Sequence, residues 1–430
     1  MDSPSQTPQP LSDPKPWAVF AHRDYTVLWA GVVSMSVTMV LRTLISAQWL
    51  YETTGSPAQL GLLGAVQLLQ MPVALYGGTL ADRVDRKKLM AMTQGMAFGM
   101  LLLLTSLAAS NALQPWHIFA ATGISGMVNM LGAAARPAML PRVIPRELLP
   151  HAVTVQVATR QVSMIFAPII FWQVFERYGV TTAFAIATVT AFISLLSPIL
   201  IHASGKPEAG AGRPTTASAM KEGFRFVMGH RLLPGLYLLD IGVVIVSFYR
   251  QLFPIFADQL YGLGAAGTGL LNTADAVGGI IGTFLVLYTS RFRRKGLIVL
   301  IGTLVYAVFL FAFGANRIFP VGLVIVAILG ATDSISMTMR QTIVQLTTPD
   351  MLLGRASSAH SFAAMGANHL GQIEVGVMSG LIGAGNTMLL GGVVSLLVVG
   401  AIWKLMPGIR RYRYDPANPY ERHEQISTSR

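Results

Sequence analysis

Long apolar runs alternate with short polar segments along almost the whole chain. Most of these runs extend over about 20 residues, the length that an α-helix needs to cross the hydrocarbon core of a bilayer. The pattern therefore predicts an all-α membrane protein with twelve transmembrane helices. Their expected ranges are 25–50, 60–80, 89–109, 117–135, 151–175, 181–201, 234–257, 266–290, 297–314, 318–339, 356–382 and 387–406.

The two halves of the chain repeat one pattern. A shift of 204 residues aligns Arg136 with Arg340, and it also aligns Gly78 with Gly282, Gly126 with Gly330 and Pro145 with Pro349. An even number of helices per repeat gives both six-helix bundles the same orientation, related by an axis along the membrane normal. The expected divisions are an N-terminal tail (1–24), a first bundle (25–202), a linker with a surface helix (203–233), a second bundle (234–406) and a basic tail (407–430).

Polar residues form stripes on two of the predicted helices. On the first helix Ser34, Thr38, Arg42 and Ser46 recur at every fourth position, which places them on one face. On the seventh helix Asp240, Ser247, Gln251 and Asp258 follow helical spacing as well. Such stripes favour protein or water over lipid, so we expect the two faces to meet across a central axis.

Ionisable groups within membrane spans are costly and mark functional sites by default. Glu374 and Arg42 are the preferred transport candidates, since each lies well away from the predicted inner boundary. Asp275 is either a proton or substrate site or half of a buried ion pair. Asp333 and Arg340 are interpreted first as partners of loops, and they are about 10 Å apart along one helix, too far to pair directly. Further cavity candidates are Asn129 and Arg250.

Composition narrows the class of protein. Hydrophobic residues make up 53% of the 430 residues and charged residues only 12%, about half the charged share of soluble domains. The net charge is +12, but most of the Lys and Arg residues fall in alternate connecting segments. This bias orients the chain with both termini in the cytoplasm and needs no nucleic acid to explain it. The histidine spacings predict no metal site, and no cofactor is expected.

The connection after the second predicted helix, GGTLADRVDRKKLM (residues 77–90), is short and strongly charged. It resembles the signature loop of the major facilitator superfamily at Gly78, Leu80, Ala81, Asp82, Arg83, Arg86, Lys87 and Lys88. Asp85 departs from the pattern, because the family usually has glycine there. Residues 49–152 look like the drug:proton antiporter branch that includes enterobactin exporters and macrolide efflux pumps. We call residues 77–90 the switch loop.

The resemblance implies a conformational switch in which Asp82 caps the eleventh helix and Arg83 and Arg86 bridge the two bundles. It also implies a monomeric transporter in the bacterial inner membrane that moves a small molecule, with protons as the expected coupling ion. Our first hypothesis is proton-coupled export of a drug-like or siderophore-like molecule. Uptake or facilitated diffusion of a solute is the second, and a non-transporting receptor on the same fold is the third. No nucleotide-binding loop or nucleophile setting supports an enzyme.

Overall fold

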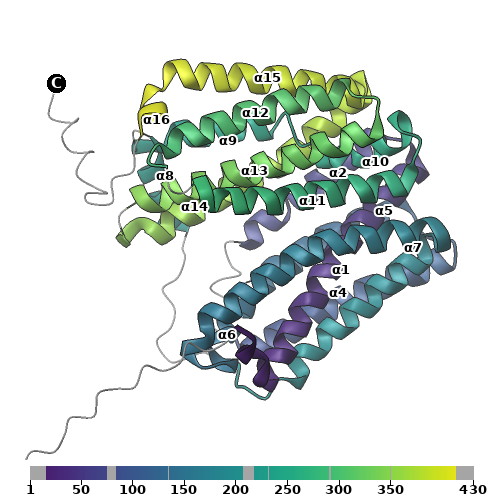
Figure 1. Cartoon of the computed structure of the whole chain (residues 1–430). Helices are drawn as coiled ribbons and strands as arrows, with labels where there is room; N and C mark the ends of the chain where they lie inside the picture. The colour runs from purple at the N-terminus through teal and green to yellow at the C-terminus, as the bar shows by residue number, and fades with distance from the viewer. Residues whose placement is uncertain are drawn as a thin grey trace, which may run out of the picture.

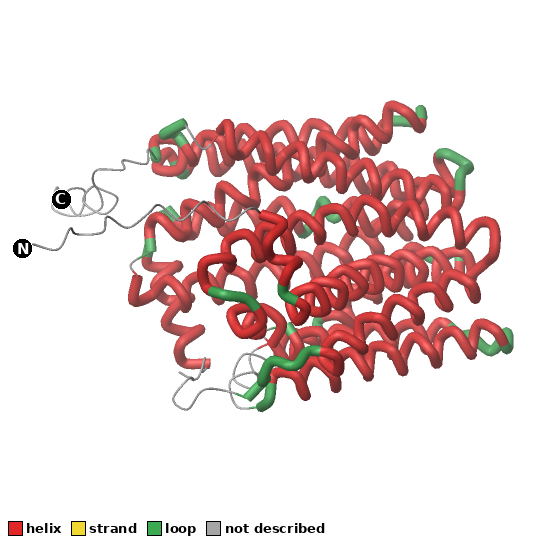
Figure 2. The backbone as a smooth tube through the Cα atoms, turned by 60° about the horizontal axis from the view of Figure 1, so that its bottom comes forward, coloured by secondary structure: helices red, strands yellow, loops and turns green. Residues whose placement is uncertain are grey.

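The computed structural model describes residues 16–74, 84–133, 135–206, 217–230, 232–289, 292–348 and 350–412. Within these ranges the chain is helical, with short connections and no strand (Figure 2). Glycines and prolines mark many of the connections. Gly55, for example, ends the first long helix with a φ of 61°, a conformation that glycine adopts without strain.

The first part of the chain contains α1 (Arg23–Thr54), α2 (Pro57–Gln67), α4 (Arg86–Ala109), α5 (Pro115–Gly132), α6 (Ala135–Val143) and α7 (Leu149–Leu200). Of these, α1, α4, α5, α6 and α7 lie together in the lower part of Figure 1, and we call them the first helix group. Helix α2 lies at the boundary and contacts both α5 and α14.

The second part contains α9 (Leu233–Val244), α11 (Gly264–Thr289), α12 (Lys295–Ala315), α13 (Phe319–Thr347), α14 (Asp350–Ile382) and α15 (Ala384–Leu405). These helices lie together in the upper part of Figure 1, and we call them the second helix group. The amphipathic helix α8 (Ala217–Gly229) packs against α14, and the short α16 (Pro407–Arg411) packs against α12.

One expectation about the first part of the chain was wrong, and another is confirmed. The fourth predicted helix, 117–135, was expected to be followed by a non-helical connection, but α6 runs from Ala135 to Val143. A proline in the first turn of a helix loses no intrahelical hydrogen bond, so Pro137 does not prevent this start. The fifth and sixth predicted helices, in contrast, are both present within α7, where Gly179 separates them with a φ of 77°.

The seventh predicted helix is also not continuous. Helix α9 ends at Val244 and is followed by η3 (Tyr249–Leu252), α10 (Phe253–Ile255) and the π-helical turn η4 (Phe256–Leu260). The hydroxyl of Tyr306 on α12 donates a hydrogen bond to the Ser247 carbonyl oxygen at 3.0 Å. This bond satisfies a carbonyl at the break, which is what irregular backbone within a membrane requires. The predicted stripe on this segment is therefore broken between Asp240 and Gln251.

Glycines set the closest helix contacts. A Cβ atom at Gly278 or Gly282 of α11 would lie 1.9 or 2.3 Å from a carbonyl oxygen of α13, so these two glycines permit the close approach of the two helices. Between α2 and α14, a Cβ at Gly376 would lie 2.5 Å from the Cα of Gly61. The contact between α11 and α13 lies within the second helix group. The contact between Gly376 and Gly61 joins α2 to that group.

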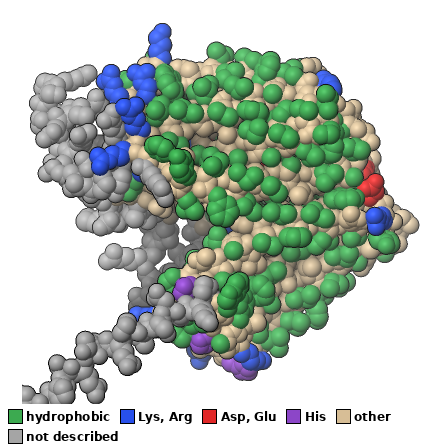
Figure 3. Space-filling model, viewed as in Figure 1, with side chains coloured by type: hydrophobic (Ala, Val, Ile, Leu, Met, Phe, Trp, Pro, Cys, Tyr) green, Lys and Arg blue, Asp and Glu red, His purple; other side chains and the backbone are tan. Residues whose placement is uncertain are grey.

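The outer surface separates by polarity. Hydrophobic side chains cover the sides of the helices, and Lys and Arg gather at one end (Figure 3). We call this the basic end; its exposed cations include Lys88, Arg293, Arg294 and Arg410. Within the described residues, nine helices are long and apolar enough to cross a membrane. The two helix groups touch near the opposite end and diverge towards the basic end, where the surface is hollowed between them.

Candidate functional site

A cavity of about 300 Å³ with a mixed polar and apolar wall lies where the first helix group and α2 face η3 and α14. Predicted site residues contribute a large part of its wall: Thr38, Arg42, Ser46, Asn129 and Gln251 all line it. Ser34 does not, although its carbonyl oxygen accepts a hydrogen bond from the Thr38 hydroxyl at 2.7 Å. Among the described residues, the wall also includes Met35, Met39, Leu63, Gln67, Gln70, Thr93, Leu101, Thr122, Arg136, Met365 and His369.

Hydrogen bonds across the boundary fix the cavity wall. The Gln70 amide and the His369 Nε2 atom lie 2.7 Å apart, and the Gln67 amide donates to the side chain of Gln372 at 3.3 Å. The Gln251 amide donates to the carbonyl oxygen of Leu60. These contacts join α2 and the residues after it to η3 and α14. The cavity wall is therefore held partly by bonds between the α2 segment and the second half of the chain.

Two arginines face the cavity without a carboxylate. Arg42 has no hydrogen bond or ion pair within the part of the chain that the structure describes. Arg136 donates to the Asn129 Oδ1 atom at 3.0 Å and contacts the Met35 sulfur. No Asp or Glu is among the described residues that line this cavity. Its wall is thus basic and otherwise amide-rich, hydroxyl-rich or apolar.

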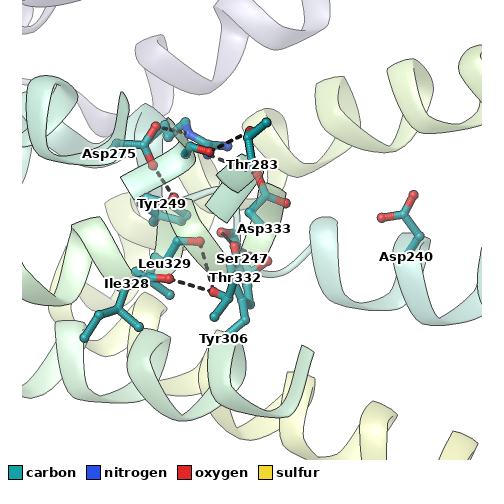
Figure 4. A network of polar contacts seen from close by, with 12 residues as sticks. Asp240, Ser247, Tyr249, Asp275, Thr283, Tyr306, Ile328, Leu329, Thr332 and Asp333 are labelled. Carbon is teal, nitrogen blue, oxygen red and sulfur yellow. Dashed lines mark hydrogen bonds and ion pairs between the residues drawn. The ribbon is translucent and has the colours of Figure 1, made fainter. Parts of the chain in front are cut away.

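The acids gather in the second helix group. Arg250, in η3, donates from Nε to Asp275 on α11 at 2.7 Å and from a terminal nitrogen to Asp333 on α13 at 3.1 Å. The Tyr249 hydroxyl donates to the other oxygen of Asp275 at 2.5 Å (Figure 4). Two carboxylates thus share one guanidinium group. We call Arg250, Asp275, Asp333 and Tyr249 the acidic cluster. Asp275 is only 14% exposed, whereas Asp333 is 33% exposed.

A separate ion pair lies deeper in the same group. Arg340 of α13 and Asp240 of α9 are 2.7 Å apart and only 9% and 8% exposed. Arg340 also donates to the Ser336 hydroxyl. Asp240 stands apart from the acidic cluster in Figure 4 and does not line the large cavity. The interpretation of Asp333 and Arg340 as partners of loops was wrong, because both pair with residues of the seventh predicted helix.

Other predicted residues have less polar surroundings. Ser247 accepts a hydrogen bond from Tyr306 at the helix break and is buried. Glu374 lies on α14 with its Oε2 atom buried and without a hydrogen-bond partner in the described part of the chain. Glu374 is outside the wall of the large cavity. A buried carboxylate without a partner is expensive when charged, so this residue remains a functional candidate.

Part of the switch loop can be placed. Gly78, Asp82 and Arg83 lie outside the described residues. Arg86 donates to the carbonyl oxygen of Ala138, and the Lys87 ammonium donates to that of Ile201, so both bind within the first part of the chain. Asp85 is the N-cap of α4, with its carboxylate accepting from the Lys87 backbone N–H at 2.9 Å. Asp85 thus has the stabilising role of a helix cap.

Sequence reasoning missed some cavity residues. Arg136 was noted only as a repeat position, because the helix was expected to end beside it. Gln67, Gln70 and His369 were not selected, although each is a polar residue on a predicted apolar span. That signal could have found them. Tyr249 could not be selected from the sequence, because its hydrogen bond to Asp275 depends on the break after α9.

A helical bundle with apolar sides, a cavity lined by two arginines and internal ion pairs are features of a multi-pass membrane protein. The chain belongs to the transmembrane secretion effector family of the major facilitator superfamily, with residues 14–425 matched by the family profile. It is therefore a transporter and not an enzyme.

Relatives and solved structures agree with this assignment. The chain is 26% identical over 408 residues to the enterobactin exporter of Shigella boydii serotype 4, covering 93% of each chain. It is 26% identical over 412 residues to the enterobactin exporter of Citrobacter koseri, covering 94% of each chain. Its fold is similar to a nucleoside transporter (TM-score 0.70, 12% identity, 89% of this chain and 99% of that one). It is also similar to a D-xylose-proton symporter (TM-score 0.64, 15% identity, 91% and 99%).

Proposed function

We propose that this chain is a proton-coupled exporter of a small, siderophore-like or drug-like organic molecule in the bacterial inner membrane. The names of the two exporters that it resembles support export as the direction. In this proposal the chain works as a monomer of twelve spans, divided into halves at 25–202 and 234–406. The two halves rock about the central cavity, as in transporters built from parallel repeats.

Orientation follows from the distribution of charge. The basic end faces the cytoplasm, because Lys and Arg are enriched in cytoplasmic connections. Both termini are then cytoplasmic. The contacts between α2 and α14 close the outer side, and the hollow between the groups opens inward. A substrate would enter the cavity from the cytoplasm in this arrangement.

The observation that carries the proposal is the proximity of a substrate-sized cavity to the acidic cluster. Gln251 lines the cavity, and the neighbouring Arg250 holds the two acids. Both residues belong to the short helix η3, which follows the break in the seventh span. A change in the ionic contacts of Arg250 therefore acts directly on the cavity wall. This arrangement supports coupling between proton binding and substrate binding.

Asp333 is the acid we assign to proton binding. It is more exposed than Asp275 and has a longer contact to Arg250. Asp333 borders cavities of about 20 and 30 Å³, each with room for about one water. The groups around it are Arg250 and Tyr249 of η3, Asp275 of α11, Tyr306 of α12, Asn368 of α14 and the pair of Asp240 and Arg340. Protonated Asp333 would leave Arg250 and Asp275 as a neutral pair.

The switch loop would hold the inner side closed in the other state. Asp82, Arg83 and Arg86 are the proposed bridging residues, with Gly78 allowing the turn and Lys87 adding charge. A carboxylate at a helix N-terminus is stabilised by about 0.3–1 kcal/mol when exposed, which suits a contact that must form and break. The bonds of Arg86 and Lys87 within the first part of the chain are the resting contacts of the open state.

The test is proton movement in proteoliposomes. We expect addition of a substrate, found by screening enterobactin, macrolides and lipophilic cations, to drive proton flux through the wild-type protein. Asp333→Asn should abolish this flux while keeping substrate exchange in the absence of a gradient, because Asp333 does not line the large cavity and Arg250 keeps its ion pair with Asp275. Asp275→Asn should also reduce the folded yield, since it weakens bonds to both Tyr249 and Arg250.

Glu176→Gln is the matched control, because Glu176 is exposed on α7 away from the cavity and should leave proton flux unchanged. Glu374→Gln tests the other candidate acid. Substrate-driven proton flux that persists in the Asp333, Asp275 and Glu374 variants would exclude proton coupling through these groups.

A further inference from the structure

We propose that the large cavity selects an organic anion, with Arg42 and Arg136 as its recognition groups. This inference rests on the proposed transport function, because it specifies the chemical class of the transported molecule. The starting observation is the charge of the wall, which holds two guanidinium groups and, among the described residues, no carboxylate. Cations inside a membrane-spanning bundle are normally paired with an acid, so a ligand can supply the negative charge that this wall lacks.

The internal repeat shows that this imbalance is particular to the first half. The 204-residue offset that aligns Arg136 with Arg340 places Ser36 at the position of Asp240. It also places Asn129 at the position of Asp333. The second half therefore has acids where the first half has neutral residues, although both halves keep the arginine.

The contacts of Arg136 and Arg340 differ in the same way between the two halves. Arg340 reaches α9, the first helix of its group, and finds the Asp240 carboxylate at 2.7 Å. Arg136 reaches α1, the first helix of its own group, and contacts the Met35 sulfur, a neutral and weak acceptor. Its other described bond is to the amide oxygen of Asn129. The guanidinium of Arg136 is thus held in place but not neutralised.

Arg42 adds a second positive group in the same cavity. It has no hydrogen bond within the described ranges, so its five N–H donors are available to a ligand. A planar guanidinium binds carboxylates, catecholates, sulfonates and phosphates through paired N–H donors. The apolar part of the wall, including Met39, Leu63 and Leu101, suits a hydrophobic body attached to that anionic group.

The anionic group could belong to a soluble metabolite or to a lipid headgroup, and the experiment separates these sources. The full chain is placed in phosphatidylcholine nanodiscs without a proton gradient. Binding of 2-naphthoate is compared with binding of 2-naphthamide and 2-naphthylmethylammonium by calorimetry and thermal shift. We expect 2-naphthoate to bind and to raise the melting temperature, with little binding of the neutral and cationic probes.

Variants assign the effect to the two arginines. Arg42→Gln and Arg136→Gln should each raise the dissociation constant for 2-naphthoate by roughly ten- to a hundredfold, the usual value of a hydrogen bond to a charged group. Arg42→Lys keeps the positive charge and should keep the preference for the anion. This variant therefore distinguishes an effect of charge from a loss of folding. Arg177→Gln is the control, since it removes an exposed arginine of α7 remote from the cavity.

Equal binding of 2-naphthoate and 2-naphthamide would overturn the proposal, as would unchanged affinity in both glutamine variants. Nanodiscs that contain phosphatidylglycerol identify the source of the anionic group. If this lipid competes with 2-naphthoate and the competition depends on Arg42, the site binds a lipid headgroup. If the lipid does not compete, the site binds a soluble anion. Both results support an anion site. Because no gradient is used, failure of proton coupling would leave this binding result intact, and the two proposals fail independently.

Discussion

Charged residues of the second helix group differ in how fully they are neutralised. Asp240 and Arg340 form a one-to-one pair with both side chains less than a tenth exposed. In the acidic cluster, Arg250 is shared by two acids and is 36% exposed. A buried one-to-one ion pair has no surplus charge, so we assign the pair of Asp240 and Arg340 to structure. The acidic cluster has one more acid than base, so one of its carboxylates can take up a proton.

We predict that Arg340→Met or Asp240→Asn alone lowers the free energy of unfolding by about 3–5 kcal/mol, because each leaves a buried charge without its partner. The double substitution Asp240→Leu with Arg340→Met should recover much of this loss. Reversible unfolding in mixed detergent micelles measures the cycle. Additive losses in the double variant would show that the two charges do not stabilise one another.

Pairings of distant residues were the part of the site that sequence could not supply. The four-residue spacing of Thr38, Arg42 and Ser46 predicts a shared face by local geometry alone, and these side chains do share a cavity wall. The partners Asp240 and Arg340 are 100 positions apart. Their contact depends on how α9 packs near α13, which no local pattern encodes.

Helix breaks and glycine contacts determine how the elements meet. The long apolar run from 234 to 257 predicts a span, but side-chain spacing does not reveal where its backbone departs from the helix. At the break the Ser247 carbonyl oxygen accepts a hydrogen bond from Tyr306, a residue of another helix. Glycine pairs were easier to anticipate, because small residues at helical spacing allow close approach whichever helix is the partner.

Two glycine substitutions should have different effects. Gly282→Val places a side chain against the backbone of α13 inside the second helix group, so we expect a large loss of folded yield. Gly376→Val places it against Gly61 of α2, so we expect the protein to fold with the contact between α2 and α14 opened. Size-exclusion chromatography measures the first effect.

Labelling measures the second effect. The chain has no cysteine, and Ser379→Cys introduces one at a buried position of α14. Gly376→Val should accelerate its reaction with a water-soluble maleimide. An unchanged labelling rate in a folded Gly376→Val protein would mean that this glycine contact does not hold the end closed.

At the scale of the whole molecule, two groups of helices meet at one end and diverge at the other (Figure 1). The repeat with a 204-residue offset predicts two like-oriented halves from sequence, because an even number of spans returns the chain to its starting side. Sequence does not indicate which end is closed in a given structure. The same chain contains the residues that close either end. Packing between α2 and α14 identifies that end here.

Rocking of the two halves is the central claim, and distance measurements by electron spin resonance test it most directly. One pair of labels is placed at the basic end with Lys88→Cys and Arg293→Cys, and another at the opposite end with Arg177→Cys and Ile318→Cys, all at exposed positions. When substrate and a proton gradient are applied, we expect the distance at the basic end to shorten while the distance at the opposite end lengthens. Distances that stay fixed at both ends, or that change in the same direction, would contradict alternating access by rocking.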